Sequence, residues 1–228
     1  MIRTGIFALA TAVVLATTGV ATQPSKSPAQ PGIKSGFQTP SQTPFFNNPD
    51  IRANIKLSDD QFNRLNKAYT DAYGPYQKML SGLPDTLTDQ QRIDRTQQMT
   101  RDFYSKFNNT ANDVLNPQQR TRFNQLSLQY QGPAAFSDPT VTERLKLTPE
   151  QRTKLNELDQ QWTKQMNTIS DKYRSDPKAA STQFNDLVKT NNERVNAILN
   201  DQQQRTWREM IGDPFTFQAN AYFQTSQK

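Results

Sequence analysis

The sequence predicts an all-α protein with two tandem helical-hairpin units of long amphipathic helices. The first observation is a motif of a leucine, a small polar residue, two variable residues and a glutamine, which occurs five times, at Leu57–Gln61, Leu87–Gln91, Leu115–Gln119, Leu147–Gln151 and Leu199–Gln203. The second is that apolar residues between the motifs recur at steps of three and four, the period of one helix face. No strand pattern competes over this part of the chain.

Each motif predicts the start of a helix. A Ser, Thr or Asn followed three residues later by Gln forms a capping box, in which the polar side chain accepts from the N3 amide and the Gln accepts from the N-cap amide. The preceding Leu is placed to contact the first turn. We interpret the motif as structural, not as a ligand site. Its residues are Leu57, Ser58, Gln61, Leu87, Thr88, Gln91, Leu115, Asn116, Gln119, Leu147, Thr148, Gln151, Leu199, Asn200 and Gln203.

The first 46 residues predict an export signal followed by a spacer. Residues 1–21 combine the basic Arg3, an apolar run and small residues that allow cleavage after Ala21, as in a signal peptide. An uncleaved membrane anchor is the alternative, but the run is shorter than the roughly 20 residues that span a bilayer. Residues 22–46 are rich in Pro, Ser and Gln and predict a disordered spacer. We therefore expect a periplasmic or secreted protein without stable membrane insertion after cleavage.

The chain between the spacer and the tail repeats itself. Asn48-Pro49-Asp50-Ile51 is matched 90 residues later by Asp138-Pro139-Thr140-Val141, and the ends of the two units match at an offset of 84. The change of offset places a net difference of six residues in the middle of the unit. This predicts a first unit at 47–136 and a second at 137–216.

Inside each unit the apolar spacing predicts two long helices and a short closing helix. The long helices are about 25 residues each, or about 38 Å long. Gly74-Pro75 is expected to kink or break the first of them. Glycine followed by proline is expected to end each unit. The remaining tail, residues 217–228, is aromatic at its start, and we expect it to pack back over the helices; an exposed apolar strip is the alternative.

The composition argues against an enzyme and against metal or cofactor binding. The chain has no His and no Cys, which removes the usual ligands of zinc and haem, the usual base and thiol nucleophile, and every disulfide. Asp59-Asp60 lies in the first turn of a predicted helix, where acidic residues favour the helix dipole. No glycine-rich phosphate loop is present. We therefore assign no catalytic, cofactor-binding or metal residues.

The charge argues against a nucleic-acid partner. The chain has 27 Lys and Arg against 21 Asp and Glu, a formal net charge of +6, but the two signs are interspersed along the helices. The aromatic residues lie at helical core spacing, so packing explains most of them better than base stacking does.

With its export signal and repeated helix starts, the chain resembles the LTXXQ-motif (Spy/CpxP-like) family of periplasmic stress proteins. Leu147–Gln151 and Leu87–Gln91 match the motif, whereas the other three copies have Ser or Asn in place of Thr. The resemblance covers most of residues 50–212. It implies a helical hairpin, usually paired into a cradle, that holds unfolded envelope proteins without ATP or takes part in stress sensing.

Two features depart from that family. Metal-responsive members use His or other soft ligands, and this chain has no His. It also has two hairpins in one chain, which suggests a monomer that builds internally what shorter members build by dimerising; a homodimer is the alternative. The expected function is an exported protein-binding factor, an ATP-independent chaperone or envelope-stress modulator, whose basic residues and exposed aromatic edges attract unfolded proteins. The alternative is a structural or adaptor protein of the cell envelope without chaperone activity.

Overall fold

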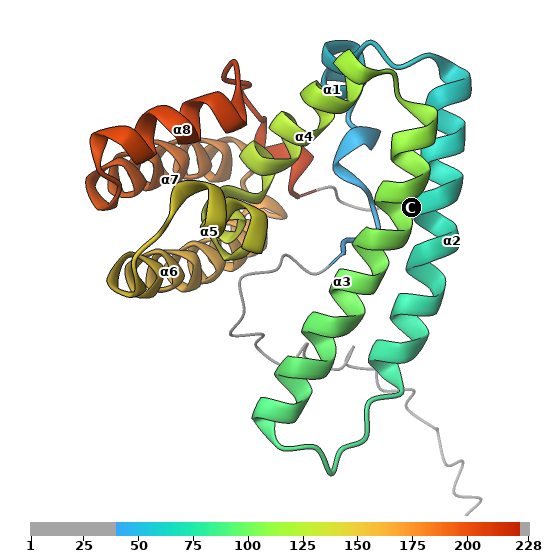
Figure 1. Ribbon diagram of the computed structural model, residues 1–228, viewed down its shortest axis with the longest axis horizontal. Helices are drawn as coiled ribbons and strands as arrows, with labels where there is room; N and C mark the ends of the chain where they lie inside the picture. The colour runs from blue at the N-terminus through green and yellow to red at the C-terminus, as the bar shows by residue number, and fades with distance from the viewer. Residues whose placement is uncertain (1–39, 224–228) are drawn as a thin grey trace, which may run out of the picture. The chain divides into compact units, whose positions relative to one another are not determined.

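A computed structural model of the protein describes residues 40–223 (Figure 1). These residues form eight α-helices and three short 3-10 helices and no strand, which confirms the all-α prediction. The predicted signal peptide, residues 22–39 of the predicted spacer and residues 224–228 of the tail lie outside the described part. Within residues 40–223, no helix has both the length and the apolar character needed to cross a membrane.

The first unit is a hairpin of two long helices between two shorter ones. A 3-10 helix, η1 (Phe45–Asn47), precedes α1 (Pro49–Ile55), α2 (Asp59–Ser81), α3 (Asp89–Val114) and α4 (Pro117–Gln131). Figure 1 shows α2 and α3 side by side along their length. The two long helices and the closing helix lie where the sequence predicts them.

The second unit repeats this order of elements. After η2 (Gly132–Ser137), which spans the predicted boundary between the units, it contains α5 (Pro139–Leu145), α6 (Pro149–Tyr173), α7 (Pro177–Ile198) and α8 (Asp201–Ile211), and η3 (Ala219–Ala221) follows in the tail. Helices α6 and α7 pack against each other as α2 and α3 do. Glycine ends the closing helix in both units, at Gly132 with φ 57° and at Gly212 with φ 62°, in agreement with the predicted stop signal.

The short helices α1 and α5 were not predicted, because seven residues are too few to show a helical period. Asn48 caps α1 by accepting from the amide of Asp50, and Asp138 caps α5 by accepting from the amide of Thr140. Proline follows each cap at the first helical position, where its missing N–H costs little. The repeated Asx-Pro pair was therefore a usable signal for both helices.

Of the kink or break expected at Gly74-Pro75, the break is wrong, because α2 runs through both residues without interruption. Proline removes one backbone hydrogen bond. Both residues lie on the exposed side of α2, where water can satisfy the freed carbonyl.

The difference in length between the units is mainly in the connection between the long helices. Residues 82–88 connect α2 to α3, whereas residues 174–176 connect α6 to α7. The motif Leu87–Gln91 forms the start of α3. Asp176 caps α7 instead, by accepting from the amide of Ala179, so the second unit has one motif fewer.

The prediction of a disordered spacer is wrong for residues 40–46, which pack onto the first hairpin. Phe46 is fully buried and its ring stacks on Phe107 of α3 at 5.7 Å. Tyr69 of α2 donates from its hydroxyl to the carbonyl of Ser41 at 2.8 Å. The proline-rich composition indicated an extended chain, but it did not show that the phenylalanines at its end fill the hairpin core.

The buried residues form three clusters. One joins residues 45–55 to the aromatic faces of α2, α3 and α4; the second joins α5 to the adjoining ends of α6, α7 and α8; the third lies between α6 and α7 under the tail. Phe217 and Phe223 are both buried, which confirms for residues 217–223 that the tail packs back over the helices.

Candidate functional site

All five leucine-to-glutamine motifs form capping boxes at the starts of α2, α3, α4, α6 and α8. In the first, the Gln61 amide donates to Ser58 Oγ at 3.2 Å, and the Ser58 amide donates to Gln61 Oε1 at 3.1 Å. The glutamine side chain of each motif therefore faces back toward its own N-cap. This local geometry leaves its Nε2 group free to reach other elements.

Two motifs of the first unit are joined through their glutamines. Gln61 Nε2 donates to Gln119 Oε1 at 2.7 Å, and Gln119 Nε2 donates to Gln61 Oε1 at 2.9 Å. The second proton of each amide goes to a helix-end carbonyl, of Val114 at 3.1 Å and of Lys56 at 2.9 Å. Each glutamine amide thus donates two hydrogen bonds and accepts two. Together the pair connects the starts of α2 and α4 to the ends of α1 and α3.

The second unit contains the same arrangement. Gln151 and Gln203 exchange amide hydrogen bonds of 2.7 and 2.9 Å, and their remaining protons go to the carbonyls of Ile198 and Leu145. The fifth motif differs, because Gln91 is exposed and its described hydrogen bonds are those of its own capping box. A glutamine amide suits the paired positions because its nitrogen donates two hydrogen bonds while its oxygen accepts others.

The sequence placed each motif at a helix start but did not indicate which motifs pair. The pairs are 58 and 52 residues apart, beyond the reach of any local pattern. Their internal hydrogen bonds leave little capacity for a ligand. Through these bonds the paired motifs hold helix starts of each hairpin against helix ends, in keeping with the interpretation of the motif as structural.

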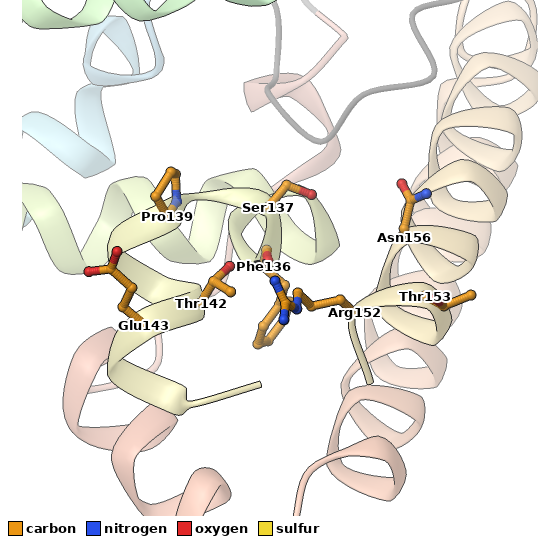
Figure 2. A pocket seen from close by; sticks show the side chains of 8 residues that line it. All are labelled: Phe136, Ser137, Pro139, Thr142, Glu143, Arg152, Thr153 and Asn156. Carbon is orange, nitrogen blue, oxygen red and sulfur yellow. Dashed lines mark hydrogen bonds between the residues drawn. The ribbon is translucent and has the colours of Figure 1, made fainter. Parts of the chain in front are cut away.

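A shallow hollow of about 590 Å³ lies between α5, η2 and the beginning of α6 (Figure 2). It is lined by Phe136, Ser137, Pro139, Thr142, Glu143, Arg152, Thr153 and Asn156. Figure 2 shows Glu143 on α5 with its carboxylate directed away from the Arg152 guanidinium on α6. The lining thus combines apolar surface with the Glu143 carboxylate, the Arg152 guanidinium and the Asn156 amide.

Comparison of the two units explains the hollow. At the equivalent place in the first unit, the Arg52 guanidinium lies 3.8 Å above the Phe62 ring and 2.9 Å from Asp59. The matching positions, 90 residues later, are Thr142 and Arg152. A short threonine and an exposed arginine do not fill the space that the stacked pair occupies.

The threonine hydroxyls of the hollow are engaged by backbone carbonyls. Thr142 and Thr153 donate their hydroxyl protons to the carbonyls of Phe136 and Pro149, so neither is activated by a neighbouring base. Among residues 40–223 there is no group of three or more acidic side chains placed to hold a metal ion.

The core of the second unit contains two buried polar side chains that the sequence did not reveal as core residues. Asp159 of α6 and Asn191 of α7 stand where the first unit has Tyr69 and Phe107, whose ring centroids are 5.4 Å apart. Asn191 donates to the carbonyl of Leu187 at 3.0 Å. Burial raises the pKa of the Asp159 carboxyl from 3.8 to about 6.

No aromatic side chain in the described part of the chain is fully exposed, so the accessible aromatic edges there belong to half-buried rings. Every Phe, Tyr and Trp between residues 40 and 223 is buried or half-buried, and Met79, at 47% exposure, is the only exposed large apolar side chain there. The apolar spacing identified helical faces, but it could not show which segment covers each face.

One aromatic face is covered by the tail itself. We define the tail segment as Phe215–Phe223 and the tail groove as the surface beneath it, formed by Gln129 and Tyr130 of α4, Tyr173 of α6 and Phe184 of α7. The ring of Tyr222 stacks on Tyr130 at 4.5 Å and lies 4.9 Å from Phe184, while Phe223 lies 5.5 Å from Tyr173. Aromatic rings of the groove thus contact the aromatic rings of the tail segment.

The groove also contacts the backbone of the tail segment. The amide of Phe215 donates to Gln129 Oε1 at 2.8 Å, and the Tyr130 hydroxyl donates to the carbonyl of Ala221 at 3.3 Å. These two bonds involve the peptide backbone, so they do not depend on the tail sequence.

A comparison of this chain with known protein families, with characterised proteins and with solved structures finds no match.

Proposed function

We propose that this chain is an exported helical protein-binding factor that acts as an ATP-independent chaperone for unfolded or envelope proteins. It would belong to the same functional class as the LTXXQ-motif proteins it resembles, would perform no catalysis, and would act in the periplasm or outside the cell. The observation that supports this proposal most directly is the tail groove, a helical surface occupied by an aromatic polypeptide segment.

The physical basis is a combination of weak and unspecific contacts. Ring contacts and backbone hydrogen bonds suit many unfolded segments equally well, because neither requires a particular sequence. The net charge of +6 adds a long-range attraction for acidic chains, which raises the rate of encounter.

The test is suppression of aggregation by the full chain. A chemically denatured client is diluted into buffer with stoichiometric protein and no nucleotide, and light scattering is followed. We expect reduced scattering for several unrelated clients. No reduction with any of them would contradict the proposed function.

The second candidate is a structural or adaptor protein of the cell envelope without chaperone activity. The lack of a large exposed apolar surface favours this second function, because Met79 is the only exposed large apolar side chain in the described part of the chain. Co-purification with one defined partner, without effect on denatured clients, would support this function over the first.

A further inference from the structure

We infer that the tail groove is the client-binding surface and that the chain's own tail segment occupies it as a displaceable competitor. The partner is an extended, uncharged polypeptide segment with aromatic residues at intervals. This inference rests on the proposed function and names its site and substrate class.

The composition of the tail segment is the first support. Phe215–Phe223 reads Phe-Thr-Phe-Gln-Ala-Asn-Ala-Tyr-Phe, with four aromatic residues and no charge. It thus has the chemistry of a segment that is normally buried in a folded protein and becomes exposed on unfolding. A surface that accommodates it will accommodate similar segments of other proteins.

The second support is how the segment is bound. Most of it has no helix or strand of its own, since only η3 (Ala219–Ala221) is regular. It is attached through its side chains, with Phe217, Ala219 and Phe223 buried and Tyr222 donating to the carbonyl of Tyr130 at 3.1 Å. A segment attached by side chains and a few backbone bonds can leave without unfolding the helices that it covers.

The third support is the difference between the two segments that cover apolar faces. Residues 40–46 fill the interior of the first hairpin, where the Phe46 ring contacts both α2 and α3. The tail segment is less deeply buried than Phe46, which is fully buried: Phe217 and Phe223 keep 8% and 9% of their surface exposed, and Phe215 and Tyr222 are half-buried. Of the two covering segments, the tail is therefore the one suited to exchange with a client.

A client can bind only to molecules in which the tail has left the groove. Its apparent affinity is therefore the affinity of the open groove multiplied by the fraction of molecules with a released tail. Weakening the tail contacts should therefore increase client binding. The double variant Tyr222→Ala with Phe223→Ala removes two tail rings and leaves Tyr130, Tyr173 and Phe184 in place. The matched control is Thr216→Ala with Gln218→Ala, which changes two exposed residues of the same segment.

The experiment measures binding of a fluorescein-labelled peptide with the sequence of residues 215–223 to the full chain, by fluorescence anisotropy. We expect the Tyr222/Phe223 variant to bind at least 10-fold more tightly than the unchanged chain, and the Thr216/Gln218 control to bind like the unchanged chain. A peptide with Asp at the positions of Phe217 and Phe223 should bind none of the three proteins. Equal peptide affinity of all three proteins would overturn the inference, as would loss of helical circular dichroism in the Tyr222/Phe223 variant.

Hydrogen exchange on the unchanged full chain gives a second readout. Excess unlabelled peptide should increase exchange of the amides of residues 215–223 and leave the amides of α4 and α7 protected. Unaltered tail exchange at saturating peptide would refute displacement. If the peptide displaces the tail but denatured clients still aggregate, the groove assignment stands and the chaperone proposal fails.

Discussion

At the scale of single residues, the glutamines of the motif have two roles that differ only in their surroundings. Gln91 caps its own helix at the surface, whereas Gln119 caps its helix and also donates to Gln61 and to the carbonyl of Lys56. We therefore expect the same residue type in the same motif to contribute different amounts to stability. The difference depends on the groups that face Nε2.

Replacing Gln119 with Glu should destabilise the fold by about 2 kcal/mol or more, because a buried carboxylate would face two oxygens that have lost their donor. Urea unfolding followed by circular dichroism measures the change. Gln91→Glu is the matched control and should stay within about 0.5 kcal/mol of the unchanged chain, since its exposed carboxylate still accepts from Thr88. Equal losses in the two variants would contradict the paired arrangement.

Asp159 should make the stability of the second hairpin dependent on pH. Its pKa in the folded protein is raised to about 6, so it is protonated when folded and ionised when unfolded between pH 3.8 and pH 6. The folded state binds more protons in this window, and stability therefore falls as pH rises through it, by about 3 kcal/mol for a shift of this size. Above pH 6 the full cost of the buried charge remains.

The variant Asp159→Asn should remove that dependence. Relative to the unchanged chain, it should gain more unfolding free energy at pH 7 than at pH 4, measured by urea unfolding at both values. Glu157→Gln, an exposed change on the same helix, should show little difference between the two pH values. A pH-independent effect of Asp159→Asn would mean that the carboxyl is not protonated in the folded protein.

At the scale of elements, the two units use the same order of helices but different side chains at equivalent places. Helix starts are preserved through the capping boxes, while the interior positions change from Tyr69 and Phe107 to Asp159 and Asn191. The helical frame therefore tolerates changes of core chemistry because its termini are fixed by separate local interactions.

Ser58→Ala and Thr148→Ala should each cost about 1 kcal/mol through loss of the N-cap acceptor. Thermal unfolding of each variant tests this. Client binding should be unaffected, because neither residue lies in the tail groove. Loss of binding at unchanged stability would show that the motif is itself a binding site.

Transferring the Arg52–Phe62 pair to the second unit should fill the hollow. The double variant Thr142→Arg with Arg152→Phe should be more stable by about 1 kcal/mol, from cation–π contact and aromatic burial. Arg152→Phe alone is the control and should gain less, because its ring lacks the covering guanidinium. Chemical unfolding measures all three chains, and no gain from the double variant would count against the equivalence of the two places.

At the scale of the whole molecule, the apolar faces of the helices are covered by segments of the same chain. Residues 40–46 fill the first hairpin and residues 215–223 cover the tail groove. Covering by its own segments leaves no large exposed apolar face in the described part of the chain for a second copy. This arrangement fits the hypothesis that the duplicated hairpins replace dimerisation.

Sedimentation equilibrium of the chain without residues 1–21 should give the mass of a monomer over a range of micromolar concentrations. The physical reason is that a stable homodimer needs a substantial apolar area on each partner. An obligate dimer that persists at the lowest concentration would show that the internal duplication does not substitute for a second chain.

The sequence by itself determined where most of the helices begin and how long they are. Capping depends on groups three residues apart, such as Ser58 and Gln61, and apolar periodicity depends on neighbouring turns, so both are local. Only the tertiary structure decided that Gln61 pairs with Gln119, that residues 40–46 are packed, that Pro75 is tolerated, and that a hollow opens beside Arg152. Each of these depends on contacts between distant segments or on exposure to water, and neither is fixed by local sequence.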